Sequence, residues 1–335
     1  MSRAEVREFR MSTRAAQRRD PSISTGFRTT TSVISVIVVV GFLGFFLLIF
    51  GLTVGASGGS SIAFELFFLV IFGIIAFVVL RSVFGLGGNW RKWLRLTRFA
   101  AANGLQYRTR SPNPSYPGCV FNVGDSRMAT DHFSTQSGRY LDFGNYQYST
   151  GSGKNRSTHT WGFLAMQLDR NLPNIVLDSQ ANNGLFGTTN LPATFSRDQV
   201  LSLEGDFDRY FTLYCPKAYE QDALYILTPD VMALLIDDAS PFDVEIVDSW
   251  LLIYSAKPFN MLSTSVYQRL FSIVNTVGSK AISQTARYHD DRVPTAAANI
   301  VAPQGQRLRH GISVSTIIAV AVFGSFWLWS VFHGG

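Results

Sequence analysis

The chain has 335 residues, of which 47% are hydrophobic and 16% are charged, and its formal net charge is +6. Two widely separated cysteines, Cys119 and Cys215, exclude a disulfide scaffold and a thiolate metal site, and are most simply buried reduced thiols. The basic residues cluster beside apolar blocks, so the positive charge does not indicate nucleic-acid binding.

Residues 1–30 are rich in Arg, Ser and Thr without apolar periodicity, which predicts a disordered basic cytoplasmic tail. A transmembrane hairpin is predicted next, over residues 31–81, with spans at about 32–55 and 62–80. Its one acid, Glu65, lies a turn inside the second span and can reach the outer surface. A third span is predicted at 312–332.

Arginine and lysine residues indicate the orientation of these predicted spans. They are frequent before the first span, after the second and just before the third, and absent from the loop between the first two. The positive-inside rule then places the N-terminus and the main domain in the cytoplasm and the C-terminus outside. The predicted location is the cell membrane, crossed several times.

Residues 89–104 have the spacing of an amphipathic juxtamembrane helix. Its tryptophans share one side and its arginines another, which suits a helix lying on anionic headgroups. The alternative is a helix that packs on the domain with its arginines in solvent. The residues assigned to the membrane surface are Trp90, Arg91, Lys92, Trp93, Arg95 and Arg98.

Residues 105–287 are predicted to form a cytoplasmic α+β domain. Short strands are expected at 119–123, 126–133, 138–150, 158–168 and 174–179, and the segment GSGKNRS is expected to be a hairpin loop. Its GSGK is not a phosphate-binding loop, because Tyr148 and Asn155 occupy positions that require Gly and Ser or Thr.

The second half of this domain mixes helix and strand signals. A helix is predicted from Pro229, two strands that meet at Asp248 are predicted over 242–255, and a long amphipathic helix is predicted over 263–287. Residues 288–311 are predicted to be a linker to the third span. The predicted fold class is therefore α+β, with two N-terminal transmembrane helices and one C-terminal.

Acidic residues are concentrated in 198–257, which holds twelve Asp and Glu against three Lys and Arg. An anionic leaflet repels this region, so it is predicted to face away from the bilayer and to meet a cytoplasmic protein partner. The residues assigned to this partner face are Glu204, Asp206, Asp208, Asp237, Asp238, Asp243 and Glu245.

No catalytic, cofactor-binding or metal motif is found in the sequence. The five histidines form no ligand pair at helical spacing, and the acids around Asp206 lack the spacing of a calcium loop. A hydrolase that pairs Cys119 with His132 or His159 is a weaker alternative. No cofactor is expected, and an enzyme is not favoured.

The stretch LEGDFDRYFTLYCPKAYEQDALYILTPDVMALLID resembles a bacterial domain of unknown function that follows paired membrane spans. The matching residues are Leu203, Glu204, Phe207, Phe211, Tyr214 and the run from Tyr225 to Pro229. The whole chain also looks like actinobacterial membrane proteins. The resemblance implies an anchored cytoplasmic α+β domain and supplies no catalytic residues.

Two functions from different classes follow. The first is a membrane-tethered interaction or regulatory module whose acidic face binds a partner. The second is a membrane-anchored enzyme acting on a membrane-proximal substrate. A cleft in which carboxylates with perturbed pKa values converge favours the enzyme, whereas a flat acidic face favours the module.

Overall fold

The computed structural model describes residues 2–19, 41, 44, 90–184, 188–203, 205–294, 299–311, 323–325 and 329. The chain divides into two compact units, residues 1–99 and residues 100–335. Each is described by itself. Most of the three predicted spans, Glu65 included, lies outside the described residues.

In the first unit, helix α1 (Arg3–Arg19) replaces part of the predicted disordered tail. A capping box begins it: the Glu5 backbone N–H donates to the Ser2 hydroxyl at 3.2 Å, and the Ser2 nitrogen donates to the Glu5 carboxylate at 2.7 Å. The prediction of disorder is therefore wrong for residues 3–19. The sequence of these residues alone did not predict the helix, because the segment that stabilises it is distant in the sequence.

That partner is the helix at residues 90–102, which the sequence predicted closely. The Phe9 ring packs edge-on against Trp90 with 6.2 Å between ring centroids, and Arg98 pairs with Glu5 at 3.2 Å. Trp90 and Trp93 are buried, which corrects the expectation that their rings face a membrane surface. Arg91, Arg95 and Arg98 are exposed and Lys92 is half-buried. Headgroup contact by these basic residues stays a prediction.

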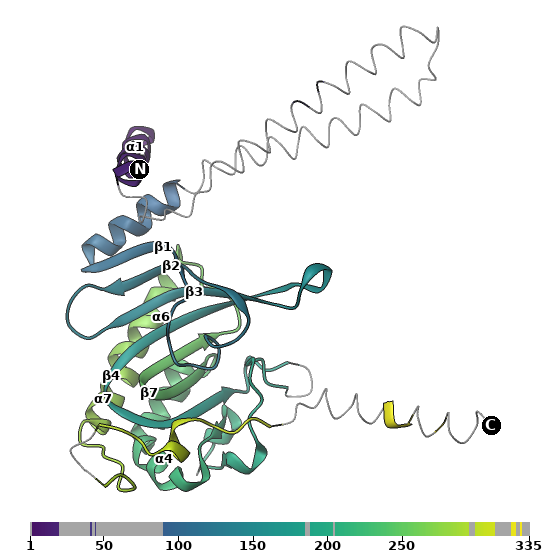
Figure 1. The fold of residues 1–335 in the computed structure, drawn as a ribbon. Coiled ribbons are helices and arrows are strands. Elements are labelled where there is room, and N and C mark those ends of the chain that lie inside the picture. Colours follow the sequence, from purple (N-terminus) through teal and green to yellow (C-terminus); the bar gives the residue numbers. More distant parts are fainter. Residues whose placement is uncertain are drawn as a thin grey trace. The chain divides into compact units, whose positions relative to one another are not determined.

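The second unit is built on a seven-stranded antiparallel sheet (Figure 1). Its strand order is β1-β2-β3-β4-β6-β5, and β7 pairs with β4. The strands are β1 (Leu105–Pro112), β2 (Asp125–Thr135), β3 (Leu141–Thr150), β4 (Ser157–Ser179), β5 (Val200–Leu201), β6 (Phe211–Tyr214) and β7 (Asp243–Ser255).

Strand β4 organises this sheet because it is 23 residues long and changes its neighbour along its length. Its first half pairs with β3, its second half pairs with β6, and β7 pairs with both halves. The two strands predicted at 158–168 and 174–179 are thus one strand. Similarly, the two strands predicted around Asp248 are the single strand β7, in which Asp248 has a φ of 51° and marks an irregularity.

Short helices complete the unit: α4 (Glu220–Ile226), α5 (Pro229–Leu234), α6 (Thr264–Ile273), α7 (Ser279–Thr285) and α8 (Pro303–Gln306). The π-helical stretch Leu235–Ala239 extends α5. A second π-helical stretch, Val274–Gly278, joins α6 to α7, so these two helices together correspond to the long helix that the sequence predicted. Helix α6 covers one face of the sheet (Figure 1), where Phe271 meets Phe143 with 5.7 Å between ring centroids.

Irregular chain covers the opposite face of the sheet. Residues 119–123, predicted as a strand, form a turn whose Phe121 is 1% exposed. The Phe121 ring lies 4.6 Å from Tyr146 and 5.5 Å from Phe163, measured between centroids. Leu191, Phe195 and Leu308 join the same buried cluster. Both faces of the central strands are therefore buried, so their sequences do not alternate between apolar and polar residues.

The predicted fold class requires correction. The described part of the chain is dominated by one large antiparallel sheet with a few short helices, and no described helix combines the length and the apolarity needed to cross a membrane. Three transmembrane helices are therefore not part of the fold that these residues show.

Candidate functional site

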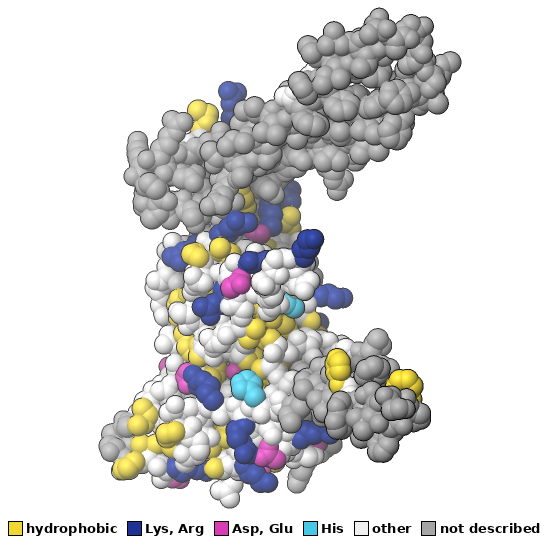
Figure 2. All heavy atoms as spheres, turned by 45° about the vertical axis from the view of Figure 1, so that its right-hand side comes forward, with side chains coloured by type: hydrophobic (Ala, Val, Ile, Leu, Met, Phe, Trp, Pro, Cys, Tyr) yellow, Lys and Arg dark blue, Asp and Glu magenta, His cyan; other side chains and the backbone are white. Residues whose placement is uncertain are grey.

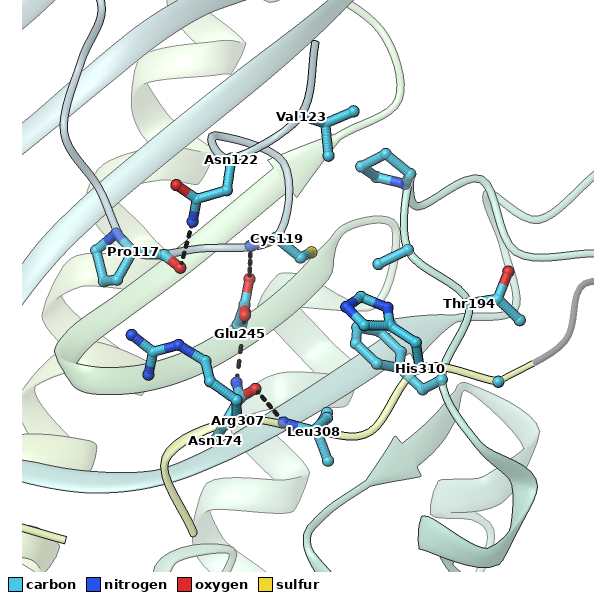
Figure 3. A pocket seen from close by; sticks show the side chains of 14 residues that line it. Pro117, Cys119, Asn122, Val123, Asn174, Thr194, Glu245, Arg307, Leu308 and His310 are labelled. Atoms are coloured by element: carbon cyan, nitrogen blue, oxygen red, sulfur yellow. Dashed lines mark hydrogen bonds between the residues drawn. The ribbon is translucent and has the colours of Figure 1, made fainter. Parts of the chain in front are cut away.

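A cavity of about 750 Å³ opens on the irregular face of the sheet (Figure 3). Three segments that are distant in sequence form it above strands β4 and β7. We call it the Glu245 cavity, and its lining residues are Pro117, Cys119, Asn122, Val123, Asn174, Pro192, Ala193, Thr194, Phe195, Glu245, Arg307, Leu308, His310 and Gly311.

The carboxyl group of Glu245 lies at the base of this cavity and is 3% exposed. It accepts hydrogen bonds from the Cys119 backbone N–H at 2.8 Å, the Tyr254 hydroxyl at 2.8 Å and the Asn174 amide at 3.2 Å. Burial raises the pKa of Glu245 above its ordinary value, and these donors oppose that rise. The group is therefore a fixed acceptor on the cavity floor.

The rim of the cavity belongs to the segment that follows α8. The Leu308 backbone N–H donates to the Asn174 side-chain oxygen at 3.1 Å, which ties this segment to β4. The guanidinium of Arg307 holds Asp248 through two contacts of 2.8 and 2.9 Å, so its charge is neutralised within the fold. His310 is exposed and pairs with Phe195 in an isolated antiparallel bridge.

Gly118 allows the turn at 119–123 to approach the cavity floor. A Cβ atom at this position would lie 1.9 Å from the Tyr254 hydroxyl oxygen and 2.4 Å from the Leu252 Cδ1. We expect Gly118→Ala to lower the free energy of unfolding by about 1–3 kcal/mol through overpacking. The double variant Gly118→Ala/Tyr254→Phe removes one obstructing atom and should recover part of that loss in urea melts. Equal stability of wild type and Gly118→Ala contradicts the close approach.

Both cysteines are free in the structure, as predicted. Burial, together with the neighbouring Glu245, raises the pKa of Cys119 well above its ordinary value, and burial raises that of Cys215 to about 12. The nucleophilic hydrolase suggested for Cys119 is unsupported, because a thiol with a raised pKa supplies little thiolate.

The same pKa shifts predict slow thiol chemistry in the folded chain. At pH 8 we expect Ellman's reagent to modify both cysteines at least about a hundredfold more slowly than in the urea-unfolded chain, because reactivity follows the thiolate fraction. The unfolded chain is the matched control. A rapid phase of one thiol per folded chain contradicts the raised pKa values of these groups.

The predicted partner face is not assembled as expected. Asp243 and Glu245 are buried at 0% and 3% exposure, because β7 is covered on both faces, so their assignment to an exposed face is wrong. Glu204 lies outside the described residues. Among the other members, Asp206, Asp208 and Asp237 are exposed, and Asp238 is half-buried.

Two of the remaining acids, Asp208 and Asp238, have hydrogen-bond partners within the fold. Asp208 accepts the Leu203 backbone N–H at 3.1 Å, and Asp238 accepts the hydroxyls of Ser272 and Thr276 at 2.9 and 2.6 Å. On the side of the molecule that Figure 2 shows, acidic side chains are scattered singly among basic and neutral ones. These contacts favour a structural role for Asp208 and Asp238.

A second hollow, of about 430 Å³, contains a hydrogen-bonded chain that the sequence analysis missed. The Asp142 carboxylate contacts the His132 Nδ1 at 2.8 Å and accepts the Tyr116 hydroxyl at 2.6 Å. The other ring nitrogen of His132 lies 2.7 Å from the Ser111 Oγ. These residues come from β1, β2, β3 and the loop after β1, so no local motif could have shown their meeting.

Comparison with known proteins adds little to this geometry. No family model and no curated protein matches the sequence. The crystal structure of the mycobacterial trehalose monomycolate transport factor A is similar at a TM-score of 0.38 and 13% identity, over 57% of this chain and 92% of that one. A likeness at this level does not establish a shared fold.

Proposed function

We propose that the chain is a binding module that holds an uncharged amphiphile in the Glu245 cavity. The observation that carries this proposal is a cavity of about 750 Å³ with apolar walls and a fixed carboxyl group at its base. Ligand cavities of about 300–1,000 Å³ with few, well-placed polar groups are typical of small-molecule sites.

The lining indicates the chemistry of the ligand. Pro117, Val123, Pro192, Phe195 and Leu308 present an apolar wall suited to a hydrocarbon chain. The polar lining includes amide, hydroxyl, carboxyl and imidazole groups, which pair with hydroxyl groups as donors or acceptors. An anionic head group is disfavoured beside the buried carboxyl, and the one guanidinium of the lining is already paired with its own carboxylate.

This proposal keeps the interaction role predicted from the sequence but moves it from an acidic face to a cavity. Placement at the inner side of the cell membrane is part of the proposal. It is supported by the basic residues that flank the uncharged apolar segments of the sequence. A lipid-like ligand is consistent with that placement.

Titration of the purified full-length chain with a fluorescent monoacylglycerol tests the proposal. We expect saturable binding that Val123→Trp weakens at least tenfold, which corresponds to about 1.4 kcal/mol, because the new side chain fills the cavity. Leu224→Trp, at a site 52% exposed and outside the cavity lining, is the matched control and should bind as wild type does.

Two results would contradict the proposal. One is binding by Val123→Trp that equals binding by the wild type. The other is equally tight binding of a fluorescent fatty acid, because burying its carboxylate beside the buried Glu245 carboxyl group is costly.

A second candidate function, an acyl-ester hydrolase, is favoured by the chain of contacts from Ser111 through His132 to Asp142. With Nδ1 protonated and facing Asp142, His132 could take the Ser111 proton at Nε2 as the Oγ bonds to an ester carbonyl carbon. The alcohol would leave with that proton, and water would then hydrolyse the acyl-serine.

A fluorophosphonate probe separates this candidate from a purely structural hydrogen-bond chain. Hydrolase activity requires covalent labelling at Ser111 that Ser111→Ala abolishes. Ser115→Ala is the control, since Ser115 is exposed and lines the same hollow. If the folded wild type is not labelled, the hydrolase function is excluded. The hydrogen bonds among Ser111, His132 and Asp142 then have a structural role.

A further inference from the structure

Exposed arginines recur at helical spacing on α1, in the first unit of the chain. Arg3, Arg7 and Arg10 occupy positions i, i+4 and i+7, and all three are exposed. Residues at this spacing lie one above another on the same face of a helix. Arg7 is two residues from both Glu5 and Phe9, which contact the other helix of this unit, so it lies about 200° around α1 from them. This row of arginines therefore faces away from the contact between the helices.

The helix at residues 90–102 carries a second row with the same spacing. Arg91, Arg95 and Arg98 are exposed on this helix at positions i, i+4 and i+7. Arg98 also joins the two helices, because its guanidinium pairs with the Glu5 carboxylate of α1 at 3.2 Å. We call these two sets of three residues the arginine rows. Both rows belong to one helical pair.

The arginine rows do not stabilise the helices that carry them. Like charges three or four residues apart destabilise a helix, and each row contains two such pairs. Within the described part of the chain, only Arg98 of the six arginines takes part in an ion pair. Arg10 lies over the Trp90 ring, 5.9 Å from its centroid. The exposed acid Glu8 follows Arg7 directly, so it lies about 100° around the helix from it. An anionic partner would relieve the repulsion within the rows.

The sequence that connects the two helices favours a lipid surface as that partner. Residues 20–89 separate them and are predominantly apolar, and their charged residues are Asp20, Arg28, Glu65 and Arg81. Clusters of four to eight Lys and Arg residues on an amphipathic helix are typical of binding to anionic lipid headgroups. Nucleic acid would also attract arginines, but it gives no reason for a long apolar stretch between the two basic helices.

We propose that the arginine rows bind the anionic surface of a lipid bilayer, with α1 as a folded part of the binding surface. The sequence predicted headgroup contact for Trp90 and Trp93 as well, but both rings are buried. Attraction then depends on exposed guanidinium groups, and salt screens such attraction strongly. This proposal does not depend on the ligand of the Glu245 cavity.

Hydrogen exchange of the α1 backbone amides tests this surface in the full-length chain, reconstituted in lipid nanodiscs. Nanodiscs of phosphatidylcholine alone are compared with nanodiscs that also contain phosphatidylglycerol. At low salt we expect the anionic lipid to slow exchange in α1 at least about fivefold, because bound arginines oppose local opening of the helix. The slowing should disappear at about 0.5 M NaCl, where the Debye length is only a few ångströms.

The double variant Arg3→Gln/Arg7→Gln should reduce this slowing to less than about twofold. Glutamine is a good helix former and removes the repulsion between two like charges, so α1 should remain folded. Arg197→Gln/Arg209→Gln removes the same charge from exposed positions in the second unit. This matched control should respond to phosphatidylglycerol as the wild type does.

Arg91→Gln/Arg95→Gln, in the second row, should likewise reduce the slowing in α1 to less than about twofold, because the helical pair binds as one surface. Equal exchange of the wild type in the two kinds of nanodisc overturns the proposal. Undiminished slowing in either double variant of the rows also overturns it. Equal slowing by a DNA oligonucleotide in phosphatidylcholine nanodiscs would assign the rows to nucleic acid and overturn the assignment to lipid.

Discussion

Replacing Phe121 with alanine is expected to lower the free energy of unfolding by about 3–5 kcal/mol. The ring is fully buried although it belongs to an irregular turn, and it contacts Tyr116, Tyr146, Phe163 and Tyr254 at centroid distances of 4.6–6.1 Å. Its removal leaves a cavity in the core that covers the irregular face of the sheet. Urea denaturation followed by circular dichroism measures the change.

Leu224→Ala serves as the comparison for this substitution. Leu224 is 52% exposed on α4, so its truncation should change stability by less than about 0.5 kcal/mol. Similar effects of the two substitutions would show that the turn at 119–123 is not packed into the core, and the wall of the Glu245 cavity would then be misplaced.

The second large effect is expected for Glu245→Leu. The substitution leaves the Tyr254 hydroxyl, the Asn174 amide and the Cys119 backbone N–H without their acceptor. Each unsatisfied buried group costs about 1–3 kcal/mol, so a loss of about 3 kcal/mol is expected, moderated by water entering the cavity. Chemical denaturation again measures it.

Glu245→Gln separates hydrogen bonding from charge in this test. Its amide keeps one acceptor oxygen of nearly the same shape, so most of the stability should remain. If Glu245→Leu is as stable as wild type, the hydrogen bond from the Cys119 backbone N–H does not hold the turn to β7, and the carboxyl group is not the fixed base of the cavity.

Local signals in the sequence were sufficient for several elements. The glycine-rich hairpin between β3 and β4, the helix start at Pro229 and the apolar stripe over 263–287 each correspond to structure. These features depend on neighbouring residues. For residues 157–179 the sequence predicted two strands, whereas the structure has one continuous strand that includes Arg170 and Asn171.

The candidate sites could not be predicted in this way. Cys119 and Glu245 are 126 positions apart, and the contact between them depends on the turn that lies over β7. The acidic residues of β7 were assigned to an exposed face because an anionic leaflet repels negative charge, yet irregular chain buries Asp243 and Glu245. The burial of these two side chains depends on tertiary contacts, so the local sequence could not predict it.

Photo-crosslinking tests the Glu245 cavity most directly as the binding site. A monoacylglycerol that carries a diazirine on its chain would be irradiated with the purified full-length chain, and the labelled peptides would be mapped by mass spectrometry. We expect label on residues 117–123 and 192–195, reduced in Val123→Trp and retained in Leu224→Trp. Label that avoids both segments, or that is unchanged in Val123→Trp, would contradict binding in the Glu245 cavity.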